Sequence, residues 1–180
     1  MTVGWLKQLE DGIFNSNSMV ISKLQRVLIC PSLLIQVDQQ ESLQDPHEGM
    51  IIKNLSFKVG QTLTVVGVAK PDATNFDLNI GPNEEDITLH INPRFNAHGD
   101  ENVIVCNSFE GGNWCEEVRQ GGFPFQQGEE FKIVIEFTPA EFVVTLSDGS
   151  TINFPNRMGA EKYSVIKFNG EARVTSFEVK

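Results

Sequence analysis

Three polar side chains with rigid hydrogen-bonding geometry occupy every second position in one stretch, and a binding function can first be inferred from them. They are His90, Asn92 and Arg94. Alternate side chains of a β-strand point to the same face, so the spacing predicts one face carrying an imidazole, an amide and a guanidinium. These groups form hydrogen bonds in fixed directions. The combination suits recognition of a neutral, hydroxyl-rich ligand such as a sugar.

A second group of candidate binding residues follows in the same stretch. Asn107 comes directly after an apolar run, and Trp114 follows a Gly-Gly turn. Glu117 and Arg119 are again two residues apart. Two polar strand faces and one tryptophan predict a shallow saccharide-binding groove.

The charge balance argues against two classes of partner. The chain has 180 residues, with Lys and Arg totalling 14 against 24 for Asp and Glu, and a formal net charge of −10. Phosphate backbones and anionic membrane surfaces attract basic proteins, so we expect no nucleic-acid partner and no membrane insertion. A neutral ligand meets no such electrostatic penalty.

The cysteines predict neither a disulfide framework nor a metal site. Cys30, Cys106 and Cys115 are odd in number and irregularly spaced, and the chain contains no CxxC pair. We therefore expect no metal and no cofactor. Reduced thiols suit a protein that is made and folded in the cytosol.

The first 45 residues differ from the rest of the chain. The segment after Met19 carries Lys23 and Arg26 and then an apolar run interrupted by Pro31. That run is shorter than the ~20 apolar residues of a spanning helix. We interpret residues 1–45 as an N-terminal extension whose order the sequence leaves open. The alternative is a targeting segment, used if translation starts at Met19, although no small-residue cleavage site follows it.

From residue 46 to the end the pattern is that of strands and turns. Strict alternation over Phe131–Phe137 predicts a strand with one buried face. No convincing helix lies between the runs, so we predict a single all-β domain over residues 46–180, an antiparallel β-sandwich. The expected strands are Met50–Phe57, Thr62–Val68, Phe76–Ile80, Ile87–Ile91, Val103–Cys106, Phe131–Phe137, Phe142–Leu146, Thr151–Phe154, Ser164–Phe168 and Val174–Val179.

The order and spacing of these motifs resemble the galectin family, and most closely its small single-domain, or prototype, members. The matching motifs cover about residues 48–180, and agreement at so many separated positions is specific. They are His90-x-Asn92-x-Arg94, the NPRF run, Val105-x-Asn107, Trp114-x-x-Glu117-x-Arg119, FPFQ at Phe123–Gln126, LSDG at Leu146–Gly149 and FPNR at Phe154–Arg157.

The resemblance implies an antiparallel jelly-roll β-sandwich. It also implies a lectin that binds β-galactosides such as lactose and N-acetyllactosamine, without metal and without chemistry on the sugar. Trp114 would stack on the apolar face of galactose. The implied polar contacts are His90, Asn92 and Arg94 to the axial 4-hydroxyl, Asn107 and Glu117 to the 6-hydroxyl, and Arg94, Glu117 and Arg119 to the adjoining sugar. His98 is a candidate neighbour at the extended side of the groove. Arg94, Glu117 and Arg119 are expected to form a charge network.

Alternative interpretations remain for single residues. A lone strand histidine is more often structural than ligand-binding, a lone Arg–Glu pair is usually solvated, and a lone tryptophan is more often core. Paired acidic residues, among them Asp100, could suggest glycoside hydrolysis, and Cys106 a thiol nucleophile. Cys106 lies in an apolar run and is expected in the core, so we predict no enzymatic activity. A structural or protein-interaction sandwich with an idle sugar site is the alternative function.

Assembly and location follow from the resemblance. We expect a homodimer that pairs through the terminal strands, Met50–Phe57 and Val174–Lys180, and cross-links glycans of glycoproteins and glycolipids. Ile51, Ile52, Leu55, Phe177 and Val179 are the apolar residues expected to need cover there. Localisation is expected to be cytoplasmic, and extracellular by non-classical secretion.

Overall fold

The computed structural model describes residues 49–119 and 121–180, and in them every named strand pairs antiparallel with its neighbours. The predicted extension, residues 1–45, lies outside the described residues.

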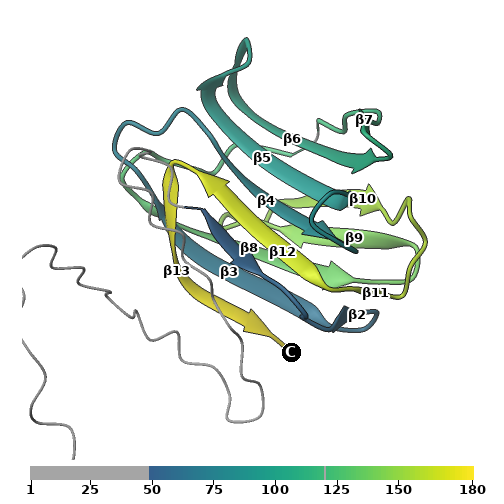
Figure 1. Cartoon of the computed structure of the whole chain (residues 1–180). Coiled ribbons are helices and arrows are strands. Elements are labelled where there is room, and N and C mark those ends of the chain that lie inside the picture. Colours follow the sequence, from purple (N-terminus) through teal and green to yellow (C-terminus); the bar gives the residue numbers. More distant parts are fainter. Residues whose placement is uncertain (1–48, 120) are drawn as a thin grey trace, which may run out of the picture.

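Two large sheets pack face to face as a β-sandwich (Figure 1). The six-stranded sheet has the order β1 (Met50–Ile52), β12 (Val165–Gly170), β4 (Phe76–Gly81), β5 (Ile87–Ala97), β6 (Asp100–Glu110) and β7 (Asn113–Trp114). The five-stranded sheet has the order β10 (Thr151–Pro155), β9 (Glu141–Thr145), β8 (Glu130–Phe137), β3 (Thr62–Ala69) and β13 (Ala172–Val179). A short ribbon joins β11 (Lys162–Tyr163) to β2 (Phe57–Lys58).

Alternation along the strands builds the core between the two sheets. In β8 the side chains of Phe131, Ile133, Ile135 and Phe137 are buried, as predicted, while those between them are more exposed. Phe76 of β4 stacks on Phe131 with ring centroids 4.6 Å apart, which ties one sheet to the other. Burial of such aromatic side chains dominates the stability of a sandwich core.

The strand predicted over Met50–Phe57 divides into two in the structure. Asn54 has φ of 59°, a left-handed conformation that ends β1 and turns the chain out of the six-stranded sheet. The chain then enters β2 in the small ribbon. Lys53 and Asn54 interrupt the apolar residues at this point, and asparagine tolerates a left-handed backbone, so the sequence carried a signal that the predicted strand passed over.

Strands β5 and β6 are longer than their apolar runs predict. Their hairpin closes at His98 and Gly99, which have φ of 54° and 82°. Two consecutive positive φ values give a turn whose twist matches that of the flanking strands. Both strands therefore continue past their apolar runs. Polar residues interrupt the apolar pattern there, although Phe95 and Ser108 in these added parts are buried.

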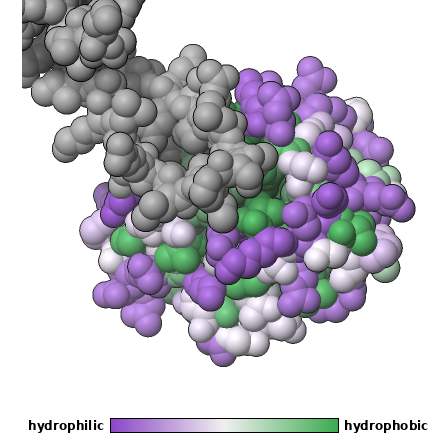
Figure 2. All heavy atoms as spheres, turned by 90° about the horizontal axis from the view of Figure 1, so that it is seen from below, coloured by the Kyte–Doolittle hydropathy of each residue, from purple (hydrophilic) through white to green (hydrophobic). Residues whose placement is uncertain are grey.

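The edge strands β1 and β13 each pair with one neighbour and carry the ends of the described chain. The expectation that several apolar residues here need cover is wrong for three of them. Ile52, Leu55 and Phe177 already belong to the buried core, with exposed fractions of 2%, 3% and 7%. Ile51 and Val179 are only partly buried. On the side of the molecule where β13 and the C-terminus lie, hydrophobic residues alternate with hydrophilic ones at the surface (Figure 2).

Candidate functional site

The imidazole of His90 is held by two neighbouring residues on β4. Nδ1 of His90 lies 2.6 Å from Oδ1 of Asn79, and Asn79 in turn donates from its Nδ2 to Asp77. Because Oδ1 of Asn79 is an acceptor, Nδ1 of His90 must be the donor, which leaves Nε2 as an acceptor. Burial lowers the pKa of His90 to about 4, so the ring is neutral at pH 7.

Asn92 lies two residues along β5 and is almost completely buried, with 3% of its surface exposed. Its Nδ2 donates to the carbonyl oxygen of Phe76 at 2.7 Å and to Oδ1 of Asn75 at 3.3 Å. Its Oδ1 accepts from Nε of Arg94 at 2.7 Å. The amide is thus fixed in one orientation, and it fixes the guanidinium beside it.

The charged residues form a chain in which Asp100 links the two arginines. Nη1 of Arg94 and Nη1 of Arg119 each lie 2.6 Å from an oxygen of Asp100. Arg119 also contacts Glu117, with Nη2 2.7 Å from Oε2. The expected network of Arg94, Glu117 and Arg119 is therefore completed by a carboxylate that was considered only as a catalytic candidate. Hydrogen bonds from Arg119 and Arg94 lower the pKa of Asp100, so the bridge stays charged at neutral pH.

Asn107 of β6 lies directly opposite His90 in the sheet register. Its Nδ2 donates to the carbonyl oxygen of Cys115 at 2.9 Å. Its Oδ1 accepts from the backbone N–H of Ser108 at 2.8 Å. An amide nitrogen carries two hydrogens, so one N–H of Asn107 remains for a ligand.

Trp114 is the one large hydrophobic side chain that the described residues leave exposed, at 52%. It stands on β7 after the turn at Gly111 and Gly112, whose φ values are 58° and 84°. This is the exposed hairpin that the glycines predicted. The indole lies against His90, with ring centroids 4.8 Å apart, and edge-on to Phe109 at 5.1 Å. An open aromatic face therefore borders the polar groups of β5.

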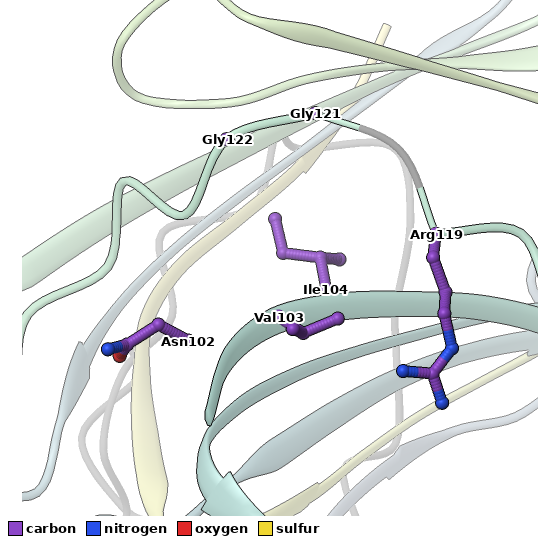
Figure 3. Close-up of a pocket in the computed structure, with 6 residues that line it drawn as sticks. All are labelled: Asn102, Val103, Ile104, Arg119, Gly121 and Gly122. Carbon is purple, nitrogen blue, oxygen red and sulfur yellow. The ribbon is translucent and has the colours of Figure 1, made fainter. Parts of the chain in front are cut away.

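His98 interacts electrostatically with His90, as the weakest of the charges that act on that ring. It occupies the β5–β6 turn, and its side chain is exposed. A hollow of about 250 Å³ lies near the start of β6 and has Arg119 in its lining (Figure 3). It is lined by Asn102, Val103, Ile104, Arg119, Gly121 and Gly122. The hollow adjoins the groove at Arg119, and neither Trp114 nor His90 lines it.

The described residues bear on three other kinds of function: a metal site, a membrane span and a reactive thiol. Residues 49–119 and 121–180 contain no group of three or more His, Cys, Asp or Glu side chains placed to hold a metal ion. Over the same residues no helix has the length and apolar content needed to cross a membrane. Cys106 is buried in the core, as predicted, and burial raises the pKa of its thiol to about 12, which keeps it protonated and unreactive. Cys115 is free and exposed.

The sequence profile described as galactoside-binding lectin matches residues 48–179. The chain belongs to this family, the galectins. A β-galactoside-binding lectin of Electrophorus electricus is 54% identical over 132 residues, which is 73% of this chain and 98% of that protein. Among solved structures, the Dario rerio galectin-1-L2 has a TM-score of 0.71 and 62% identity, covering 72% of this chain and 98% of its own.

Two further solved galectin structures add information about ligand and assembly in those proteins. Congerin II liganded with lactose and MES has a TM-score of 0.71 and 36% identity, and covers 74% of this chain and 100% of its own. CG-16, a homodimeric agglutinin from chicken liver, has a TM-score of 0.70 and 38% identity with the same coverage. Both are therefore aligned over the galectin domain and leave the first part of this chain unmatched.

Sequence reasoning missed the residues that orient the galectin site from outside its motif. Asn79 and Asp77 hold His90, and Asp100 joins the two arginines. Asn79 lies opposite His90 in the β4–β5 register, and a register is not readable from either strand alone. Asp100 carried one available signal, because it begins β6 close to Arg94 on the other arm of the hairpin.

Proposed function

We propose that this galectin binds β-galactosides, such as lactose and N-acetyllactosamine, on the outer face of the six-stranded sheet. The observation that carries the proposal is the exposed face of Trp114 beside His90 and Asn107. Hydrogen bonds within the protein fix the orientation of these two side chains and leave one hydrogen-bonding atom of each for a ligand. Galactose has one apolar face, rich in C–H groups, and a crown of hydroxyls. A tryptophan face and directional polar groups are the complement of such a surface.

The hydrogen bonds left over by the protein define what the first polar row can recognise. Nε2 of His90 remains an acceptor, and Nη2 of Arg94 remains a donor. One hydroxyl can therefore donate to the imidazole and accept from the guanidinium at once. The axial 4-hydroxyl of galactose fits this role. The equatorial hydroxyl of glucose points away, and each buried group left unpaired costs about 1–3 kcal/mol.

Asn107 and Glu117 can recognise a second hydroxyl in the same way, with one donor and one acceptor. The remaining N–H of Asn107 donates, and the carboxylate of Glu117 accepts. The 6-hydroxyl of galactose suits this pair, and Arg119 then faces the adjoining glucose or N-acetylglucosamine. The partners implied are glycans of glycoproteins and glycolipids. The lactose-liganded structure of congerin II, a similar protein, supports lactose binding by this chain.

Retention on immobilised lactose tests the proposal directly. We expect the full chain to be retained, and to be eluted by free lactose but not by sucrose, which lacks galactose. Passage through the column without retention would instead favour the alternative, a protein-interaction sandwich whose sugar site is idle.

We further propose that the chain forms a homodimer through the edge strands β1 and β13. A single shallow site binds with a Kd of about tens to hundreds of micromolar, or about −5 to −6 kcal/mol, so cross-linking needs two sites. The open edges of both sheets and the partly buried Ile51 and Val179 support the proposal, as does the homodimeric chicken agglutinin. Sedimentation of the full chain is expected to give twice the monomer mass, and a monomer at every concentration would contradict it.

Location is a separate proposal. The free thiols of Cys106 and Cys115 support synthesis in the cytosol, followed by non-classical export to meet extracellular glycans. Export should continue when transport from the endoplasmic reticulum is blocked. Export that stops under that block would contradict the proposal.

A further inference from the structure

Arg157 lies outside the groove but contacts its supporting residues from the opposite sheet. It follows β10 of the five-stranded sheet, at the end of the FPNR motif. Its Nη1 donates to Oδ1 of Asn107 at 3.3 Å and to Oγ of Ser108 at 3.0 Å. Its Nη2 donates to the carbonyl oxygen of Glu116 at 2.8 Å. One guanidinium thus bonds to β6 and to the segment between Trp114 and Glu117.

The guanidinium itself is held from behind, so its position does not depend on a ligand. Its central carbon lies over the ring of Phe154, 4.6 Å from the centroid. The preceding residue, Asn156, is buried and donates from Nδ2 to the carbonyl oxygens of Pro139 and Ala160. Tyr163 donates from its hydroxyl to Oδ1 of Asn156 at 2.5 Å. The loop that carries Arg157 is therefore anchored in the core.

These contacts determine which atoms of Asn107 face the ligand. Oδ1 of Asn107 accepts from both Ser108 and Arg157, and Nδ2 donates to Cys115. A flipped amide would turn its NH2 group toward the guanidinium and lose all three bonds. The unflipped amide offers one N–H to the groove. The bond to the carbonyl of Glu116 fixes the backbone next to Glu117, the acceptor of the same pair.

We propose that Arg157 is a positioning residue of the sugar site, which sets the strength of 6-hydroxyl recognition by orienting Asn107 and the backbone beside Glu117. The inference rests on the proposed β-galactoside binding. Arg157 makes no contact with the sugar in this account. Its effect should therefore be specific to ligands that carry the 6-hydroxyl, whereas a general loss of fold would weaken every ligand alike.

The test compares lactose with 6′-deoxylactose, which lacks only the galactose 6-hydroxyl. Affinities are measured by titration calorimetry or NMR for the wild type and for Arg157→Met, which keeps an apolar stem over Phe154. The wild type should prefer lactose by about tenfold, the effect of one well-placed hydrogen-bonded pair. Arg157→Met should weaken lactose binding about fivefold and leave 6′-deoxylactose nearly unchanged, so the preference falls to about twofold.

Two further variants make the result decisive. Arg173→Met removes an exposed arginine of β13 and should retain the wild-type preference. Arg157→Lys keeps the charge but carries its donors on one nitrogen, which does not reproduce the fork by which Nη1 and Nη2 reach separate acceptors. It should lose the preference as Arg157→Met does, which covers the case that Arg157→Met does not fold. An unchanged preference in a folded Arg157 variant would overturn the positioning role. A wild type that binds neither sugar would overturn the proposed function first.

Discussion

The two polar groups of the site are built in different ways. The row on β5 is largely buried: Asn92 is 3% exposed, and the amide of Asn79 on β4 fixes His90 beside it. The residues after the β6–β7 turn are open: Trp114 is 52% exposed, and the side chains of Glu117 and Arg119 are 40% and 42% exposed. The buried row loses little freedom when a sugar arrives, so it is suited to discriminate between epimers. The exposed group supplies contact area, and its ion pairs add little to stability.

The largest effect is expected from Asn92→Ala, which breaks the buried row. The substitution leaves the carbonyl of Phe76 and Nε of Arg94 without their partner, and each buried unpaired group costs about 1–3 kcal/mol. Unfolding in denaturant should show a loss of about 2 kcal/mol or more, together with loss of lactose binding. The matched control is Asn153→Ala on the exposed side of β10, expected within about 0.5 kcal/mol of the wild type. Equal free energies of unfolding for Asn92→Ala and Asn153→Ala would contradict the distinction between the buried row on β5 and exposed side chains.

The next effect separates affinity from stability. Trp114→Ala removes the stacking surface but little buried area, so unfolding should change by less than about 1 kcal/mol. If stacking on the indole contributes about 1–3 kcal/mol, as base stacking on aromatic side chains does, lactose affinity should fall about fivefold or more and column retention should be lost. Trp114→Phe, which keeps a smaller ring, should retain part of the affinity. Near wild-type lactose affinity in the Ala variant would place the site elsewhere.

The pH dependence sharpens the assignment of the buried row. Burial lowers the pKa of His90 from 6.5 to about 4, with Arg94 lowering it further and Asp77 and Glu117 opposing the shift. The folded pKa is below the unfolded one, so this residue costs no stability above pH 6.5 and an increasing amount as the pH falls toward 4.

Sugar binding through neutral His90 should therefore be constant from about pH 7 to about pH 5 and decline as the pH approaches the folded pKa. Lactose titrations at successive pH values provide the measurement. A His98→Gln variant should move this decline to slightly higher pH, because the charge of His98 is the weakest of the contributions that lower the pKa of His90. A decline between about pH 7 and about pH 6, typical of an ordinary imidazole, would contradict the buried arrangement.

The smallest effect concerns metal. The described residues hold no cluster of metal-ligating side chains, and the recognition groups of both sides are ordinary donors and acceptors. Dialysis against EDTA should leave the lactose affinity unchanged within error. Loss of binding in chelator that calcium or zinc restores would require a different account of the site.

Local patterns predicted the strands, and they predicted the site only where its residues lie on one strand. His90, Asn92 and Arg94 occur on β5 at the spacing that gives one face, and alternation identified the buried side of β8. The break at Asn54 was missed, although Lys53 and Asn54 interrupt the apolar residues there and asparagine tolerates a left-handed backbone. The added ends of β5 and β6 were missed because polar residues interrupt their apolar runs, although Phe95 and Ser108 are buried there.

Contacts between distant parts of the chain could not be predicted in this way. Arg157 meets Asn107 across a separation of 50 residues and between two sheets. Asn79 is paired with His90 by the strand register, and Asp100 is brought to Arg119 by the course of the chain after β7. Such contacts depend on how sheets pack, whereas residue spacing determines only which face a side chain takes.

Binding of lactose and of cellobiose tests the central claim most directly. The two disaccharides differ only in the 4-hydroxyl of the non-reducing ring, axial in lactose and equatorial in cellobiose. Recognition of that hydroxyl by His90 and Arg94 predicts that lactose binds with a Kd of about tens to hundreds of micromolar. Cellobiose should bind at least about tenfold more weakly, since two buried groups lose their partner. Equal affinity for the two sugars in calorimetry would contradict the claim.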